Sequence, residues 1–249
     1  MTEPRRDGFL GGRLSIAQPV AGYRAGADAV MLAAACPAQA GESVLELGCG
    51  AGTALFCLGA RVPGLRLTGL EVQDSYAALA RENADQNGIP ARIVTGDLTR
   101  MPPELRAESF DHVISNPPYF TSGTVAPDAG RGTARHEDAP LSLWLETALR
   151  RLRPGGWLTL IHRAERLSVI LSVLGAGAGE ITILPVSARI GRDAGRIIVL
   201  ARKGAKAPLR LLSPFIMHEK PSHSADAEDL TAEAHAVLRD GAPLNLRGR

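Results

Sequence analysis

Ser43-Val-Leu-Glu-Leu-Gly-Cys-Gly-Ala-Gly-Thr53 is the stretch of this chain that decides its fold. Its opening residues are apolar, as in a short buried strand, and the apolar run 54–58 behind it predicts a helix. Between them, Gly48, Gly50 and Gly52 let the backbone turn tightly and approach a ligand closely. Strand, glycine turn and helix in that order indicate a nucleotide-binding loop, because a helix N-terminus favours negative charge.

Two acidic residues stand at the ends of neighbouring predicted strands. Glu46 precedes the glycine turn, and Glu71 directly follows the apolar run 65–70. In nucleotide-binding folds, a carboxylate about twenty residues after the glycine turn accepts hydrogen bonds from ribose hydroxyls. The glycine spacing is G-x-G-x-G rather than the dinucleotide fingerprint G-x-G-x-x-G, which argues against a dehydrogenase.

The rest of the chain alternates short apolar strands with helices. We expect strands at 43–47, 66–71, 91–95, 110–115 and 156–161, and helices at 53–61, 74–87, 138–152 and 163–174. Two later runs, 181–186 and 196–200, leave no room for a helix between them and should pair antiparallel. This pattern predicts the α/β class: a doubly wound, Rossmann-like sheet, mostly parallel, with a C-terminal antiparallel hairpin strand.

The two ends of the chain extend this core, and we expect a single domain over residues 1–249. Residues 1–40 form an N-terminal extension and helix, 41–204 the core, and 205–249 a C-terminal extension. Residues 1–20 are expected to be loose or a short hairpin. Asp28 lies near the start of a helix that reaches Cys36 and can cap it. A last helix, 225–239, should stop at Gly241.

Composition narrows the class of protein. The chain has 249 residues, of which 45% are hydrophobic, and a net charge of only +2, but its arginines are clustered. Arginine side chains bind phosphate well, so these clusters could form a nucleic-acid-binding surface. Alternatively, they are solvent-exposed and paired with nearby Asp and Glu. Three cysteines without C-x-x-C pairing, and an N-terminus without an apolar signal, predict a cytoplasmic protein. The longest apolar run, 29–36, is too short to span a membrane.

Asn116-Pro-Pro-Tyr119 is the most informative motif for chemistry. It follows the alternating run 110–115, so it leaves the end of a buried strand. Both prolines fix their own φ and restrict the residue before them, which makes the loop stiff. The loop presents an amide side chain, two free carbonyls and an aromatic ring, a set that suits a planar group bearing an NH2.

Together, these motifs resemble the class I S-adenosylmethionine-dependent methyltransferases that carry N-P-P-Y and methylate exocyclic or amide nitrogens. The resemblance covers most of the chain, roughly 18–246. Within that group, Gly22-Tyr-Arg-Ala-Gly-Ala-Asp-Ala-Val30, Ile114-Ser-Asn-Pro-Pro-Tyr119 and the tail from Leu209 are most similar to the bacterial tRNA1(Val) adenine N6-methyltransferase family.

The resemblance implies roles for particular residues. Asn116, Pro117 and Tyr119 would be catalytic: two oxygens accept the hydrogens of the amine, and the ring stacks on the base. The cofactor S-adenosylmethionine would be bound by Asp28, Glu46, Gly48, Gly50, Gly52, Glu71, Val72, Asp97, Leu98 and Asn116. The RNA substrate would contact Tyr23, Phe120, Arg202, Lys203 and Lys206. No metal and no catalytic histidine is required; His112, His136 and His162 are expected to be structural or to face substrate.

The substrate stays open at this point. The resemblance implies an adenine amine in tRNA, in the anticodon loop, and the lack of the extra domains of relatives that act on duplex DNA or on release-factor glutamine favours a small pre-shaped substrate such as a tRNA loop. Guanine in rRNA and a protein glutamine amide are the alternatives. A non-catalytic nucleotide-binding protein is a more remote one. No membrane partner is expected, and the pattern does not distinguish a monomer from a homodimer.

Overall fold

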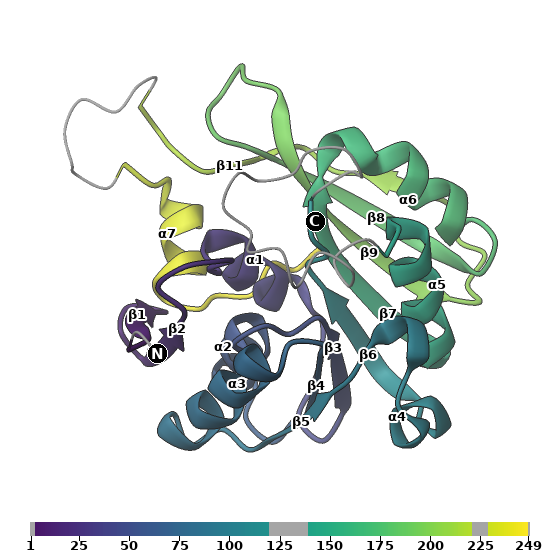
Figure 1. Ribbon diagram of the computed structural model, residues 1–249. Helices are drawn as coiled ribbons and strands as arrows, with labels where there is room; N and C mark the ends of the chain where they lie inside the picture. Colours follow the sequence, from purple (N-terminus) through teal and green to yellow (C-terminus); the bar gives the residue numbers. More distant parts are fainter. Residues whose placement is uncertain (1–2, 120–138, 221–228, 249) are drawn as a thin grey trace.

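The computed structural model describes residues 3–119, 139–220 and 229–248 (Figure 1). Its described residues form a central nine-stranded sheet with the order β10-β8-β9-β7-β6-β3-β4-β5, and β11 pairs with β8 beside this path. The strands are β3 (Ser43–Leu47), β4 (Arg66–Glu71), β5 (Ala91–Thr95), β6 (Phe110–Ser115), β7 (Leu152–Arg163), β8 (Ala178–Ser187), β9 (Ala194–Lys203), β10 (Arg210–Leu211) and β11 (Phe215–Ile216).

Among these strands, β9 is the one that runs against its neighbours. It is antiparallel to both β7 and β8, whereas the other pairs in the sheet are parallel. The predicted fold class, a mostly parallel doubly wound sheet with an antiparallel hairpin strand, is confirmed. The two-residue strands β10 and β11 were not predicted, since a run that short shows no periodicity.

Helices cover both faces of the sheet, which explains why its strands read as continuous apolar runs. One face packs against α1 (Ala27–Ala35), α2 (Thr53–Arg61), α3 (Asp74–Gln86) and α7 (Ala232–Leu238). The other face packs against α4 (Pro103–Ala107), α5 (Leu141–Arg151) and α6 (Leu167–Leu174). Short 3-10 turns, η1 (Leu98–Arg100) and η2 (Ala164–Arg166), follow β5 and β7.

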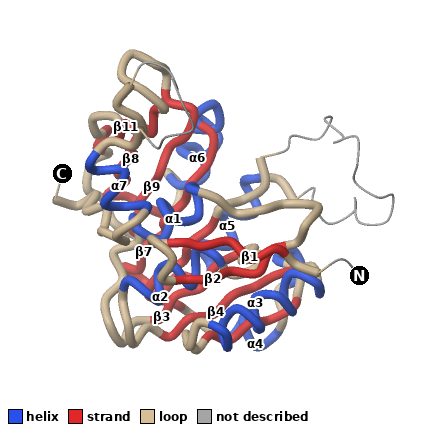
Figure 2. The backbone as a smooth tube through the Cα atoms, turned by 90° about the vertical axis from the view of Figure 1, so that its left-hand side faces the viewer, coloured by secondary structure: helices blue, strands red, loops and turns tan. Residues whose placement is uncertain are grey.

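The N-terminal residues form a hairpin of β1 (Arg5–Phe9) and β2 (Leu14–Gln18), one of the two arrangements expected for them. The hairpin lies across α2 and α3 (Figure 2). Asn83 of α3, fully buried, holds it there. The Asn83 amide accepts from the Ala17 N–H at 2.7 Å and donates to the Ala17 and Ala51 carbonyls at 3.0 and 2.9 Å. One side chain therefore ties the hairpin, α3 and the glycine turn together.

Several predicted helix limits were wrong. The helix expected from 163 starts as the turn η2, and α6 begins only at Leu167. The last helix begins at Ala232 rather than 225, because the Thr231 hydroxyl accepts the Ala234 N–H and so caps it. Residues 225–228 lie outside the described part. The helix ends before Gly241, whose φ of 69° lies in the left-handed region that favours glycine.

Candidate active site

Four loops meet at one edge of the sheet, because β3, β4, β5 and β6 are parallel and end in register. Leu47 pairs with both Leu70 and Ser115, and Glu71 pairs with Thr95. We call this the carboxyl edge. It brings together the glycine turn, Glu71, the 96–98 turn and the Asn116–Tyr119 loop, as ligand sites of parallel α/β sheets require.

The glycine turn reaches over the end of β4. The N–H groups of Gly48 and Cys49 both donate to the Leu70 carbonyl, at 2.8 and 3.0 Å. Gly48, Gly50 and Gly52 have φ values of 67°, 54° and 83°, a left-handed region that other residues rarely adopt. The three glycines are therefore required by the backbone path itself.

Glu71 is buried, with 6% of its surface exposed, and its carboxylate braces two loops. Oε2 accepts the Gly50 N–H at 2.8 Å, and Oε1 accepts the Gln73 N–H at 2.9 Å. Burial raises the pKa of this carboxyl above its ordinary value, although these backbone donors oppose the shift. A carboxylate has about four acceptor positions, so one remains beyond the Gly50, Gln73 and Val72 N–H groups that act on it. Val72 follows at the surface, and the Asp97 carboxylate accepts the Thr99 N–H at 2.7 Å beside half-buried Leu98.

Glu46 is the second buried carboxylate at this edge, with 3% exposure. Its Oε2 accepts the Leu55 N–H at 3.0 Å, and burial raises its pKa well above the ordinary value, with nearby Glu71 adding to the shift. Glu46, Gly48 and Asn116 line one narrow cavity of about 30 Å³. A water needs about 10–15 Å³, so only a small end of a ligand fits without movement of the walls.

We predict that Glu46→Gln stabilises the fold at neutral and alkaline pH. Folding raises the pKa of Glu46, so the folded protein favours the protonated, uncharged form. Below the ordinary pKa of 4.5 the carboxyl is protonated in both states and its burial does not lower stability through charge. As pH rises above 4.5, the unfolded chain ionises first, and the folded state loses stability relative to it. Glutamine keeps an acceptor for Leu55 and removes the charge. Denaturant unfolding should show a gain on the order of 1 kcal/mol at pH 8 that vanishes near pH 4. An equal gain at both pH values would contradict the prediction.

The Asn116–Tyr119 loop is closed by hydrogen bonds between its own side chains and α1. The Tyr119 hydroxyl lies 2.7 Å from Asp28 Oδ2 and 2.9 Å from Asn116 Oδ1, two acceptors for its single proton. Asn116 Nδ2 donates to the Tyr23 hydroxyl at 3.1 Å, and the Tyr76 hydroxyl donates to the Tyr23 carbonyl at 2.9 Å. Burial, then the nearby Asp28 charge, raises the pKa of Tyr119 far above its ordinary value.

Asp28 does not cap its helix, so that reading is wrong. Gly26 occupies the N-cap position without a side-chain bond, and Asp28 lies in the first turn of α1. Its Oδ2 instead accepts from the Tyr119 hydroxyl and from Arg196 Nε, the latter at 3.0 Å. The Arg196 guanidinium stands 4.5 Å from the Tyr119 ring centre, and His162 meets the ring edge-on at 5.0 Å. One face of the ring expected to stack on a base is thus covered.

Three residues expected to bind RNA are not brought to this edge. Because β9 is antiparallel to its neighbours, its last residues lie toward the amino ends of β7 and β8. Arg202 pairs with Trp157 of β7, and Lys203 pairs with Ala178 of β8. Arg202 forms a salt bridge with Glu180 at 3.3 Å, and Lys203 donates to the Leu152 carbonyl at 2.6 Å. Lys206 follows on the same amino edge. Phe120 and His136 lie outside the described residues.

Sequence reasoning missed Arg196, Gln18 and Tyr76. The Gln18 amide binds the Ala25 N–H at 2.7 Å and donates to its carbonyl at 3.2 Å, fixing the approach to α1. Arg196 had a usable signal: in an antiparallel strand that follows β8, the first residues must lie at the carboxyl edge. Tyr76 and Gln18 belong to no motif, and only the fold places them.

The described residues contain no group of three or more His, Cys, Asp and Glu side chains placed to hold a metal ion. In the same part of the chain, each helix is too short or too polar to cross a bilayer. The three cysteines are buried and unpaired.

Comparison with known proteins assigns the family. Residues 25–172 match the model of the methyltransferase small domain. The chain belongs to this family. The matched range contains the glycine turn, Glu71 and the Asn116–Tyr119 loop.

Individual relatives agree on the class of protein but not on its substrate. The tRNA1(Val) (adenine(37)-N6)-methyltransferase of Porphyromonas gingivalis is 35% identical over 164 residues, 62% of this chain and 64% of the relative. The 4-amino-L-phenylalanine/4-methylamino-L-phenylalanine methyltransferase of Streptomyces pristinaespiralis is 37% identical over 141 residues, 51% of this chain and 46% of the relative. Both matches span less than two thirds of the relative's length.

A solved structure extends the likeness over nearly the whole chain. The crystal structure of a protein described as a predicted O-methyltransferase, Atu636 from Agrobacterium tumefaciens, aligns with a TM-score of 0.70. It is 28% identical and covers 88% of this chain and 98% of its own. The likeness therefore extends beyond residues 25–172, which match the family model.

Proposed function

We propose that this methyltransferase transfers a methyl group from S-adenosylmethionine to the 6-amino nitrogen of an adenine in tRNA, in the anticodon loop. The observation that carries the proposal is the shared cavity of Glu46, Gly48 and Asn116 at the carboxyl edge. Asn116, whose oxygen would accept from the amine, thus lines the same cavity as Gly48 of the glycine turn that would hold the cofactor. The tRNA-modifying relative supports the substrate class.

The residues of the glycine turn fit this cofactor. Glu71 is a buried carboxylate with an acceptor position left for a ribose hydroxyl. A side chain at Gly50 would meet nothing nearer than the Tyr76 ring at 3.9 Å, so the backbone there is open to close approach. Asp97 and Leu98 lie at the end of β5, where an adenine ring would need an acceptor and an apolar contact. When bound, the cofactor supplies an electrophilic methyl group on a good leaving group.

The protein's task is then to position the amine. The adenine amino group is a poor nucleophile, because its lone pair is delocalised into the ring. Hydrogen bonds from its two hydrogens to Asn116 Oδ1 and the Pro117 carbonyl would hold the nitrogen in line and draw it toward tetrahedral geometry. Such positioning can account for about 7–11 kcal/mol of a barrier.

The existing hydrogen bonds let the amine replace the Tyr119 hydroxyl at Asn116 Oδ1. In the structure, Asn116 Oδ1 lies within reach of the Tyr119 hydroxyl, but that hydroxyl is closer to Asp28 Oδ2. An incoming amine can therefore take Asn116 Oδ1 while the Tyr119 proton stays with Asp28. No buried donor is left without a partner, so the penalty of about 1–3 kcal/mol for an unsatisfied group is avoided.

We predict that Tyr119→Phe keeps at least about a tenth of the turnover and that Tyr119→Ala keeps less than about 1%, since ring stacking contributes about 1–3 kcal/mol per base. Phenylalanine retains the ring contact with His162, and Asp28 keeps its bond to Arg196. Single-turnover kinetics with saturating cofactor would measure both. Equal inactivity of the two variants would assign the role to the hydroxyl instead.

Methyl incorporation into unmodified tRNA, followed by digestion and mass spectrometry of nucleosides, tests the proposed function. We expect N6-methyladenosine, and isolated anticodon stem-loops should retain the modification. Methylguanosine, or incorporation into 4-amino-L-phenylalanine but not into RNA, would overturn the substrate while leaving the methyltransferase reaction intact.

A further inference from the structure

Two arginines lie side by side on neighbouring strands at the carboxyl edge. Arg163, the last residue of β7, is the register partner of Arg196 near the start of β9. Directly opposite residues of an antiparallel pair point to the same face, here the face that α1 covers, and like charges in these positions are unfavourable unless an anion lies between or beside them. Each guanidinium here has one acidic partner: Arg196 Nε lies 3.0 Å from Asp28 Oδ2, with about a third of both side chains exposed, and Arg163 pairs with Glu165.

The surroundings leave much of this charge available. Arg163 forms an ion pair with Glu165 at 3.1 Å, but both side chains are about half exposed, so water and other anions compete for the pair. Arg166 of η2 has no hydrogen bond or ion pair to another described residue. We call Arg163, Arg166 and Arg196 the edge arginine cluster.

The charges of the cluster act on His162, and one member, Arg196, lies against the Tyr119 ring. Burial, followed by the charges of Arg166, Arg196 and Arg163, lowers the pKa of His162 to about 4. His162 is therefore neutral at physiological pH. Its own ring is in edge contact with Tyr119, and Arg196 lies over the face of that same ring.

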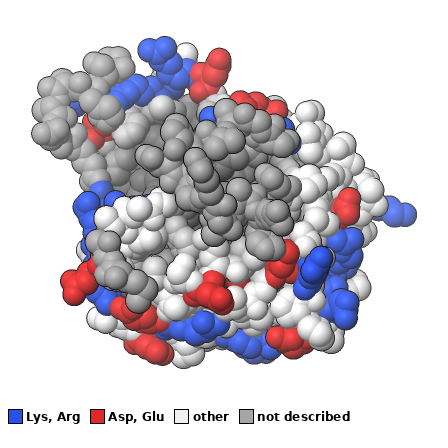
Figure 3. All heavy atoms as spheres, viewed as in Figure 1, with Lys and Arg blue, Asp and Glu red and all other residues white. Residues whose placement is uncertain are grey.

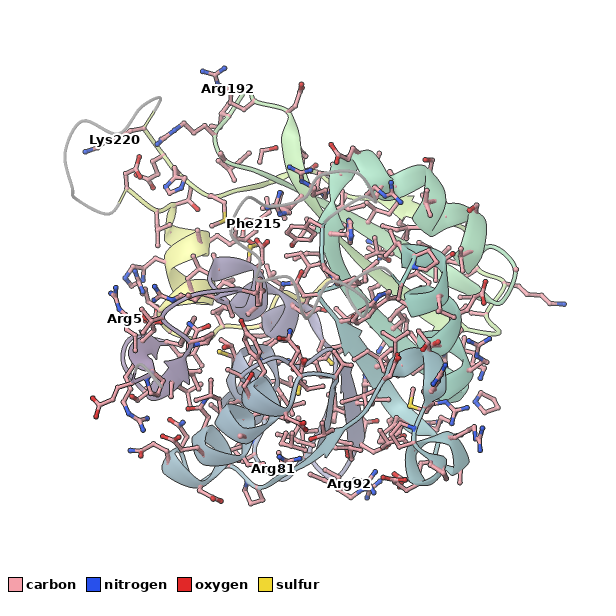
Figure 4. The ribbon with its side chains drawn as sticks, in the orientation of Figure 1. Arg5, Arg81, Arg92, Arg192, Phe215 and Lys220 are labelled. Atoms are coloured by element: carbon pink, nitrogen blue, oxygen red, sulfur yellow. The ribbon has the colours of Figure 1, made fainter. Side chains whose placement is uncertain are left out.

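The turn between β8 and β9 extends the cluster outward. β8 runs parallel to β7, so residues 188–193 project from the carboxyl edge and not from the opposite one. Ile190 is 81% exposed, and Arg192 stands at the tip, where Figure 4 shows its side chain pointing into solvent. Figure 3 shows both basic and acidic side chains at this end of the molecule.

We propose that the edge arginine cluster, with Arg192 at the turn, binds the sugar-phosphate backbone beside the nucleotide whose base enters the Asn116–Tyr119 loop. The inference rests on the proposed RNA substrate and names its binding surface. Guanidinium forks bind phosphate oxygens in pairs, and neighbouring backbone phosphates lie a few ångströms from any base presented at Tyr119. The Arg202, Lys203 and Lys206 cluster, at the opposite end of β9, lies on the wrong edge for this contact.

The test compares two double variants of the full-length protein. Arg163→Ala/Arg166→Ala removes two charges from the edge cluster, and Arg202→Ala/Lys206→Ala removes two from the amino edge. Binding of unmodified tRNA is measured between 50 and 300 mM salt (about the range over which counterion release is resolved). Calorimetry with S-adenosylmethionine and thermal unfolding accompany each variant.

The edge variant should bind tRNA about tenfold or more weakly, and the slope of log affinity against log salt should fall by about 1.5, as expected for two lost phosphate contacts. The amino-edge variant should change affinity less than about twofold. Cofactor affinity should match the parent in both. Equal losses of tRNA affinity in the two variants, or no loss in the edge variant, would overturn the assignment of the edge arginine cluster but not the proposed function. A parent protein that neither binds nor methylates tRNA would overturn the proposed function and this inference together.

Discussion

Asn116→Ala should lower the turnover number by about 10²–10³-fold, the loss typical when one preorganised hydrogen-bonding group is removed from a reacting centre. Asn116 lines the same cavity as Glu46 and Gly48, and its Oδ1 is the proposed side-chain acceptor for the amine. Alanine removes that acceptor from the amine but leaves the glycine turn and Glu71 untouched. Affinity for S-adenosylmethionine, measured by calorimetry, should therefore stay within a few-fold of the parent value.

Tyr23→Phe is the matched control for Asn116. The Tyr23 hydroxyl accepts from Asn116 Nδ2 at 3.1 Å, so phenylalanine removes the support of the amide but not its oxygen. We expect less than about tenfold loss of turnover, in line with one neutral hydrogen bond. If Tyr23→Phe were as damaging as Asn116→Ala, the amide would matter by its orientation and not as an acceptor.

Glu71→Ala should weaken S-adenosylmethionine binding by about 10- to 100-fold, or about 1–3 kcal/mol, because charged hydrogen bonds to the ribose are lost. The structure adds a second cause, since the same carboxylate braces the Gly50 and Gln73 N–H groups. Glu71→Gln keeps one acceptor oxygen and should fall between the parent and the alanine variant in calorimetry.

Glu82→Ala is the control that separates the effect of Glu71 at the cofactor site from the general effect of losing one negative charge. Glu82 lies on α3, is about half exposed and pairs with Arg6 at 2.5 Å, away from the glycine turn. Its removal should leave cofactor affinity unchanged. A folded Glu71→Ala protein with parental affinity would exclude Glu71 from the cofactor site.

Much of the fold was predictable because its signals are local. The run 43–53 contains its own strand, turn and helix start, and the segment 187–195 between the two later apolar runs is too short for a crossover helix. Helix limits were harder. The start of α7 depends on the Thr231 cap, and η2 depends on packing against β9, neither of which leaves a periodic pattern.

Only those site residues that belong to a recognisable sequence motif could be predicted. Glycines, Glu71 and Asn116–Tyr119 follow strand ends, and parallel strand ends must converge. Arg196 and Asp28, 168 positions apart in the chain, meet through the reversal of β9, which the sequence indicates only by the missing helix. The same reversal places Arg202 and Lys203 at the other end of β9 from Arg196, so their predicted contact with RNA stays a prediction that the carboxyl edge does not support.

The single amide of Asn83 has a consequence for affinity. A loop of three glycines samples many backbone conformations when free, and fixing one residue costs about 1–2 kcal/mol of conformational entropy. Asn83 holds Ala51, Glu71 holds Gly50 and Glu46 holds Leu55, so this ordering is completed during folding. The glycine turn is thus rigid before any ligand arrives, and binding energy need not be spent on immobilising it.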